Sequence, residues 1–179
     1  MTRPFGLKDI RWYMEVKLLG IAAVPGSAAM MPPQTPEKLL AEENYMLLRR
    51  QITNGAAWLD SVTRVDGLLN TLLTMPWDSQ HLVVARDVCV ALGRERAKLL
   101  TAGGRPVLEA VAQRYADTGA QEYVSLVGVL CRNGVPAALP QHMLDNARLA
   151  GLVVHAAKMG IALLVPAPAK GPVRRGKKP

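Results

Sequence analysis

Apolar residues recur at helical spacing along most of the chain, and strict alternation of apolar and polar residues is not prominent. The clearest apolar stripe keeps steps of four, three, four and three residues: Trp58, Val62, Val65, Leu69 and Leu72. Such steps place all the members on one face of a helix. Further stripes follow, and the last is formed by Met143, Leu144, Ala147, Ala150 and Val154. The pattern therefore predicts an all-α protein of about five to eight helices.

Capping and breaking residues divide this pattern into elements. Thr35-Pro36 predicts the start of a helix that runs to about Thr53, because a hydroxyl cap followed by proline is typical of a first turn. Glycines and prolines bound the later helices, and the last helix is predicted from Pro140 to about Gly160. Gly93 lies inside a helical stretch that either continues or breaks there. An extended exit is predicted for residues 161–165.

The residues available for a core favour packing of helix on helix. Aromatic residues make up only 4% of the 179 residues, so Leu, Ala, Val and Met must fill the interior. We expect an irregular helical bundle or a short α-solenoid of helical hairpins over residues 36–165. Residues 1–35 are predicted to be an N-terminal arm and linker, and residues 166–179 a basic tail containing Pro and Gly.

One unit, residues 107–137, carries a more specific pattern. A first predicted helix ends in a Tyr-x-x-x-Gly turn from Tyr115 to Gly119, and a second ends in Gly134-Val135-Pro136. The unit resembles a pentatricopeptide-type repeat. That resemblance implies a helical hairpin of the α-solenoid kind and, by analogy with the family, RNA and organelles. The alternative is that any antiparallel helix pair joined by a glycine turn shows this pattern.

The formal charge of +8 is unevenly distributed. Residues 36–165 hold thirteen basic and twelve acidic residues, a net of +1, and residues 1–35 add +2. The tail adds +5 without an acid, and it is the predicted RNA-binding segment. Its basic residues are Lys170, Arg174, Arg175, Lys177 and Lys178. A nuclear-localisation signal or a solubilising tail is the alternative interpretation.

Two further groups are candidate contacts. Arg94, Arg96 and Lys98, interrupted only by Glu95, are a candidate second RNA contact, although a solvated basic face is the more common explanation of such a cluster. Trp12, Tyr13 and Trp77 fall outside the clean helical stripes and are candidate interface anchors. The alternative is that these aromatic rings pack back on the helical body.

The sequence contains no constellation that predicts catalysis or the binding of a cofactor or metal. The histidines lack metal-ligand spacing, and the Gly103-Gly104 pair, which lacks a following Gly-Lys-Ser/Thr, is explained by a helix end followed by a helix start. Cys89 and Cys131 lie in apolar helical stretches, where buried, reduced thiols are expected. We therefore expect no catalytic residue, no cofactor and no metal site, and hence no enzyme.

These expectations combine into one functional hypothesis. The most apolar run, Leu149 to Val165, contains Lys158 near its middle, which at about 3 kcal/mol disfavours a membrane span. We expect a non-enzymatic structural subunit of a large ribonucleoprotein, namely a mitochondrial ribosome, with rRNA on the tail and several proteins around the body. The localisation is then mitochondrial, and otherwise cytoplasmic. The alternative is a helical protein–protein adaptor or a virion component without nucleic-acid contact.

Overall fold

A computed structural model of the chain describes residues 34–166 and confirms an all-α fold with one very small sheet. The elements, in chain order, are α2 (Pro36–Ala41), α3 (Tyr45–Thr53), the 3-10 helix η2 (Ala57–Asp60), α4 (Val62–Thr74), α5 (Gln80–Ala97), β1 (Thr101–Ala102), β2 (Arg105–Pro106), α6 (Val107–Thr118), α7 (Glu122–Arg132), α8 (Gln141–Leu144), the 3-10 helix η3 (Ala147–Leu149) and α9 (Ala150–Lys158).

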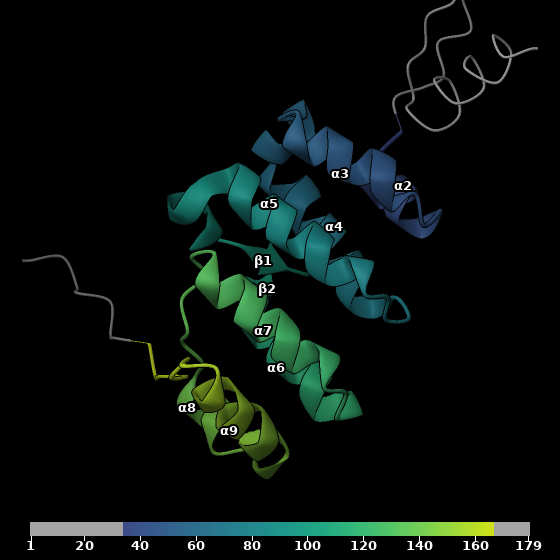
Figure 1. Cartoon of the computed structure of the whole chain (residues 1–179). Helices are drawn as coiled ribbons and strands as arrows, with labels where there is room; N and C mark the ends of the chain where they lie inside the picture. Colours follow the sequence, from purple (N-terminus) through teal and green to yellow (C-terminus); the bar gives the residue numbers. More distant parts are fainter. Residues whose placement is uncertain (1–33, 167–179) are drawn as a thin grey trace, which may run out of the picture.

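The helices are stacked along one direction in chain order (Figure 1). Helices α2 and α3 lie at the top, α4 and α5 below them, α6 and α7 next, and α8 and α9 at the bottom. One apolar cluster runs through the stack from Leu39 to Leu163. Its largest fully buried side chains are predominantly leucines, as expected for a core with few aromatic residues.

Local side-chain caps explain where several helices begin. The Thr35 hydroxyl accepts the Lys38 N–H at 3.3 Å, and Pro36 occupies the first turn of α2 as predicted. The Ser61 hydroxyl accepts the Arg64 N–H at the start of α4. Helix α6 ends at Gly119, whose φ of 69° is in the left-handed region.

The single helix predicted from residue 36 to residue 53 is wrong. The chain turns between α2 and α3, and Glu43 adopts a φ of 55°, which a continuous helix excludes. The Asn44 side chain then accepts the Leu47 N–H at 3.2 Å and starts α3. A second capping residue inside an apparently continuous pattern therefore produced two helices.

The long helix predicted from Pro140 to Gly160 is also wrong, since residues 141–158 form α8, η3 and α9. The break after Leu144 shifts the helical phase, so the predicted inward stripe is not maintained. Ala147 and Ala150 are exposed, and the side chain of Val154 is 52% exposed.

The predicted stripe is also interrupted where α4 begins. Trp58 lies in η2 rather than in α4, and Val62, predicted to face inward, is 71% exposed. Val65, Leu69 and Leu72 are buried as predicted, because they lie within the regular part of α4.

Three local features of the backbone complete the fold. Gly93, with a φ of 72°, kinks α5, so the helix breaks there. β1 and β2 form an antiparallel hairpin whose turn is Gly103-Gly104, with φ values of 61° and 75°. The explanation of these glycines as a helix end followed by a helix start is therefore wrong.

The predicted extended exit is confirmed, and it lies along the helical body. The Leu139 N–H donates to the Leu164 carbonyl at 2.7 Å, and the Leu164 N–H donates to the Ala137 carbonyl at 2.9 Å. This parallel pairing attaches residues 161–165 to the segment between α7 and α8.

Helices α6 and α7 form a hairpin with a short turn at Gly119 and pack against each other. A hairpin of this kind is what the pentatricopeptide resemblance implies, but it is also what the simpler alternative predicts. The resemblance itself stays a prediction.

Candidate functional site

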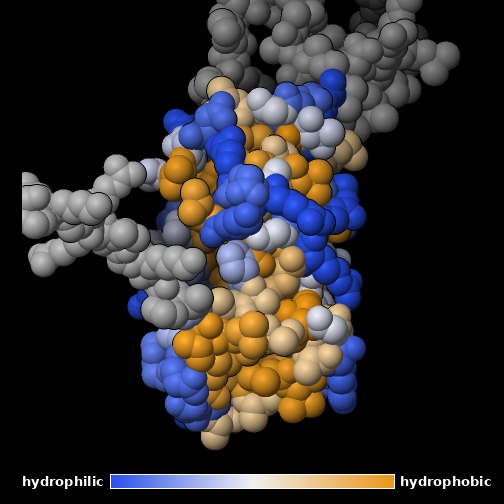
Figure 2. Space-filling view, turned by 90° about the vertical axis from the view of Figure 1, so that its left-hand side faces the viewer, coloured by the Kyte–Doolittle hydropathy of each residue, from blue (hydrophilic) through white to orange (hydrophobic). Residues whose placement is uncertain are grey.

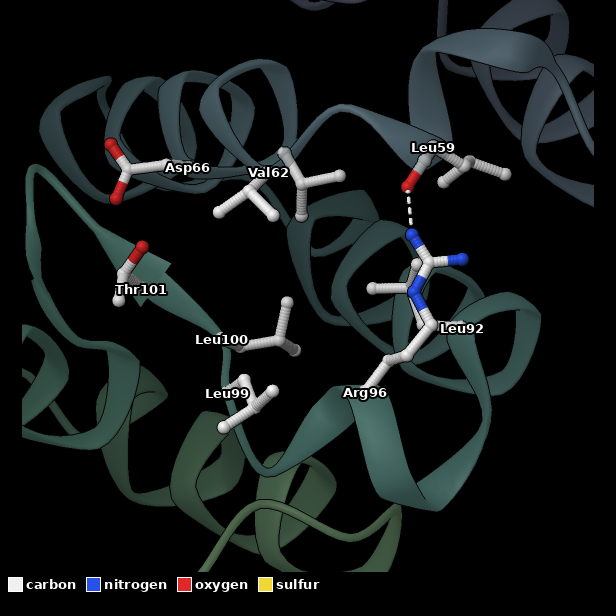
Figure 3. Close-up of a pocket in the computed structure, with 9 residues that line it drawn as sticks. Leu59, Val62, Asp66, Leu92, Arg96, Leu99, Leu100 and Thr101 are labelled. Carbon is white, nitrogen blue, oxygen red and sulfur yellow. Dashed lines mark hydrogen bonds between the residues drawn. The ribbon is translucent and has the colours of Figure 1, made fainter.

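An apolar pocket of about 240 Å³ opens where α4, η2, the end of α5 and β1 meet (Figure 3). We call it the α4–α5 pocket. Most of its walls are aliphatic, and the charged groups lie at its edges. It is lined by Leu59, Val62, Val65, Asp66, Leu92, Arg96, Leu99, Leu100 and Thr101.

Arg96 forms one wall of the pocket. Its Nη2 donates to the Leu59 carbonyl at 2.6 Å, and its Nη1 donates to the Asp60 carboxylate at 3.0 Å (Figure 3 shows the first of these bonds). The kink at Gly93 changes the direction of the last turn of α5, which carries Arg96. The two contacts tie α5 to η2, so this wall is held in place without a ligand.

Asp66 holds the opposite wall. Its carboxylate oxygens accept the Gly103 N–H at 3.1 Å and the Gly104 N–H at 2.9 Å, which ties α4 to the tip of the β1–β2 hairpin. A side chain at Gly103 would meet the Asn70 amide, since a Cβ there would lie 2.8 Å from the Asn70 Oδ1. Among the described residues no cation pairs with the Asp66 carboxylate, whose only hydrogen-bond donors are these two amides.

Two apolar side chains beside the pocket face solvent. Val62 is 71% exposed and Leu99 is 76% exposed, whereas Val65, Leu92 and Leu100 are buried. A pocket with fixed walls, an aliphatic interior and a carboxylate at one edge can bind an apolar group. The polar members of its lining are Asp66, Arg96 and Thr101, and the remaining six side chains are aliphatic.

A second notable group surrounds His81, which is fully buried. The Asp78 N–H donates to its Nδ1 at 3.4 Å, and Tyr45 Oη lies 3.2 Å from its Nε2. Because Nδ1 accepts from an amide, the proton of the neutral ring is on Nε2. Burial lowers the pKa of His81, although the carboxylates of Asp78 and Glu43 act in the opposite direction.

The two cysteines have suppressed reactivity. Burial raises the pKa of Cys89 to about 12 and that of Cys131 to about 11. The thiol is therefore the dominant form of each near neutral pH, and neither has the thiolate character of a nucleophile. Both are free, with Cys89 buried and Cys131 partly buried.

The predicted contact residues at the end of α5 are partly engaged within the chain. Lys98 pairs with Glu95 at 2.7 Å, and Arg96 is bound as described above. Arg94 is exposed, and its side chain has no hydrogen bond or ion pair among the described residues. The three side chains therefore do not form one uncompensated basic cluster, and their role in RNA binding stays a prediction.

Trp77 is half-buried against the core, with its ring edge-on to those of His81 and Tyr123 at centroid distances of 5.3 and 5.5 Å. This is the packing expected of the alternative interpretation, in which the ring supports the helical body. Trp12 and Tyr13, and the five basic residues of the tail, lie outside the described residues, and their roles also stay predictions.

A broad apolar surface covers the lower part of the molecule in Figure 2, where α8 and α9 lie. Separately, α9 and the segment that follows it expose three large apolar side chains: Val154, Leu164 and Val165 are 52%, 61% and 51% exposed. We call the surface that carries these three side chains the α9 face. Exposed apolar surface favours contact with another macromolecule.

The pocket was not predicted from the sequence, although Arg96 was a candidate contact for another reason. Asp66 was not recognised because its hydrogen-bond partners are 37 and 38 residues away in the chain. A local signal did exist, since a Gly-Gly pair flanked by short segments is typical of a two-residue hairpin turn. Leu99-Leu100 directly after a helix end was a second signal of an apolar surface near that hairpin.

Within residues 34–166, no group of three or more metal-binding side chains is close enough to hold an ion. In the same range, no helix combines the length and the apolar character needed to cross a membrane. No protein-family model, no curated protein and no solved structure matches the chain. The function is therefore inferred from the molecule's own surfaces.

Proposed function

We propose that the protein is a non-enzymatic structural subunit of a large ribonucleoprotein, with a helical body that binds neighbouring proteins and a basic tail that contacts RNA. The observation that carries the proposal is the separation of apolar surface from charge. The body presents the α4–α5 pocket and the α9 face, whereas the tail holds five basic residues without an acid.

The pairing of charges within the body supports this division. The described residues hold thirteen basic and twelve acidic side chains, a net charge of +1. Arg49 and Arg86 both bind the Asp87 carboxylate, and Arg96 and Lys98 have their own acidic partners. A surface with so small a net charge attracts phosphate weakly. The tail is therefore the stronger candidate for RNA contact.

Within this class we propose a mitochondrial ribosome as the assembly. The support is the resemblance of residues 107–137 to a pentatricopeptide-type repeat, together with the basic tail. Neighbouring proteins would then cover the exposed side chains of the body, and rRNA phosphates would bind the tail.

The test replaces the five basic residues of the tail by glutamine, which keeps its length. Binding to a structured RNA is measured by fluorescence anisotropy at several salt concentrations. We expect the plot of log affinity against log salt concentration to become less steep by about three to four units, because about five phosphate contacts are lost. An unchanged slope would show that the tail does not contact RNA. Replacing Arg94, Arg96 and Lys98 by glutamine instead is the matched control, for which we expect a smaller change.

The second candidate is a protein–protein adaptor that makes no contact with nucleic acid. The net charge of the body favours it, because at +1 the body alone has little excess charge. Sedimentation of the native complex separates the two candidates. A large particle that nuclease dissociates supports the ribonucleoprotein, whereas a complex that survives both nuclease and high salt supports the adaptor.

A further inference from the structure

We infer that the α4–α5 pocket receives one large apolar side chain of a partner protein, and that a lysine or arginine beside this side chain pairs with Asp66. The inference rests on the proposed function, in which the body binds neighbouring proteins. It names the site of that contact and the chemistry of the segment that occupies it.

The size of the pocket suits a single side chain. At about 240 Å³ it is smaller than the range of roughly 300–1,000 Å³ that is typical of pockets for drug-sized ligands. Pockets that receive one aromatic or aliphatic anchor are a common feature of protein interfaces, where that anchor contributes much of the binding energy. The aliphatic lining, from Leu59 on one side to Leu100 on the other, matches such an anchor.

The charges at the pocket edges determine what should lie next to the anchor. Arg96 already pairs with Asp60 at 3.0 Å, so this edge is close to neutral. Asp66 has no cationic partner among the described residues, and Figure 3 shows its carboxylate on the same side of the pocket as Thr101. The side chain of Thr101 makes no hydrogen bond in this part of the chain. A lysine or arginine of the partner would form an ion pair with the Asp66 carboxylate, because a carboxylate at a partly desolvated interface favours a charged donor.

The rim favours a protein over a small molecule. Val62 and Leu99 are 71% and 76% exposed, and a ligand enclosed in the pocket would leave both side chains in water. A polypeptide segment that lies across the pocket would cover them. It would also exclude water from the anchor, as the surroundings of an interface hot spot generally do.

The walls need no rearrangement to receive this anchor. The Arg96 contacts hold η2 against α5, and the Asp66 contacts hold the hairpin against α4. Preformed walls reduce the entropy lost on binding, so a short segment can bind measurably without the rest of the partner.

The experiment selects short random peptides, displayed on phage, against the full chain. We expect the enriched peptides to share a large aliphatic or aromatic residue next to lysine or arginine. Binding of a synthetic consensus peptide is then measured by fluorescence anisotropy. Leu99→Ser should weaken this binding by about tenfold or more. The matched control is Val154→Ser, which removes an exposed valine from the α9 face and should leave the affinity unchanged.

A double-mutant cycle tests the ion pair directly. Replacing the basic residue of the peptide by glutamine should weaken binding to the wild-type chain by about threefold to tenfold, and should have little effect on binding to Asp66→Asn. Asparagine keeps an acceptor for one of the two hairpin amides, and circular dichroism checks that this variant is folded. If the glutamine peptide loses the same affinity for Asp66→Asn as for the wild-type chain, the proposed ion pair with Asp66 is wrong.

Four other outcomes would overturn the proposal. Enrichment of acidic peptides would contradict the charge argument. Peptides whose binding is lost in Val154→Ser but kept in Leu99→Ser would assign the contact to the α9 face. Phenylethylamine binding as tightly as the best peptide would make the pocket a small-molecule site.

Selection that succeeds only after removal of residues 1–33 would identify the chain's own N-terminal segment as the occupant. In each case tail-dependent RNA binding is a separate measurement, so the proposed function can stand when this inference fails.

Discussion

Two regions of the body are held together by different forces. In residues 36–106, side chains far apart in sequence form polar bridges, such as Arg49 to Asp87 and Asp66 to the hairpin amides. In the described residues after Tyr115, each side-chain hydrogen bond joins residues no more than four positions apart, and no ion pair occurs. Salt and pH should therefore act mainly on the first region, whereas changes of side-chain volume should act strongly on the second.

Close packing at glycine holds the second region. Gly151 of α9 lies directly against the Tyr115 hydroxyl of α6, and Gly128 of α7 lies against the sulfur of Met159. A Cβ at Gly128 would be 3.1 Å from that sulfur. Such contacts depend on the absence of a side chain at the glycine, so close packing specifies the position of α9.

The largest expected effect is at Gly151. Gly151→Ala should lower the free energy of unfolding by about 1–3 kcal/mol, because the new methyl group overlaps the Tyr115 hydroxyl. Urea denaturation followed by circular dichroism measures the change. Tyr115→Phe removes the overlapping oxygen, and in that background Gly151→Ala should be neutral or stabilising by up to about 1 kcal/mol, as helix propensity predicts. Equal losses in both backgrounds would mean that the contact does not constrain α9.

The second effect concerns pH and the first region. Because burial lowers the pKa of His81 in the folded chain, the unfolded chain binds this proton more readily. Burial of the neutral His81 ring therefore costs no stability above the ordinary pKa of 6.5. As the pH falls from there toward the lower pKa of the folded chain, protonation increasingly favours the unfolded chain, and the free energy of unfolding decreases. We expect the urea midpoint to decrease as the pH is lowered through this window.

Replacing His81 supplies the control for this pH dependence. His81→Asn should flatten the pH dependence in this window, since asparagine has no proton to gain. A pH profile identical to that of the wild type would show that other groups control it. Helices α3 and α5 should lose hydrogen-exchange protection first in the wild type at low pH, because Tyr45 and His81 join them.

The smallest effect is expected at the pocket wall. Arg96→Met should cost about 1 kcal/mol, mainly through the lost hydrogen bond to the Leu59 carbonyl. The ion pair with Asp60 adds little, because the Asp60 side chain is 82% exposed and salt screens it. Lys98→Met is the matched control, since it removes an exposed ion pair only and should cost less than about 0.5 kcal/mol. An equal decrease in the free energy of unfolding for Arg96→Met and Lys98→Met would mean that the Arg96 contacts do not stabilise the position of η2.

The sequence predicted helices best where local chemistry determines their ends. The start at Thr35-Pro36 and the end at Gly119 follow from capping and from a left-handed φ, and both are confirmed. The break at Glu43 was not predicted, because the apolar pattern continues across it. The Asn44 cap was nevertheless a local signal that could have revealed the second helix.

The site was less predictable than the fold, because it is built from residues that are distant in sequence. The pocket joins Leu59, Asp66 and Leu100, and nothing in the local pattern brings them together. The exposure of Val62 and Val154 was also missed. Val62 is the first residue of α4 and lies beside the pocket, whereas Val154 lies in α9, whose phase is shifted by the break after Leu144.

The parallel pairing of Leu164 with Ala138 fixes the point where the chain leaves the body. Two backbone hydrogen bonds, to Leu139 and Ala137, hold residues 161–165 against the segment between α7 and α8. A load applied to the chain beyond residue 166 would therefore act first on these two hydrogen bonds, and only after their loss on α9.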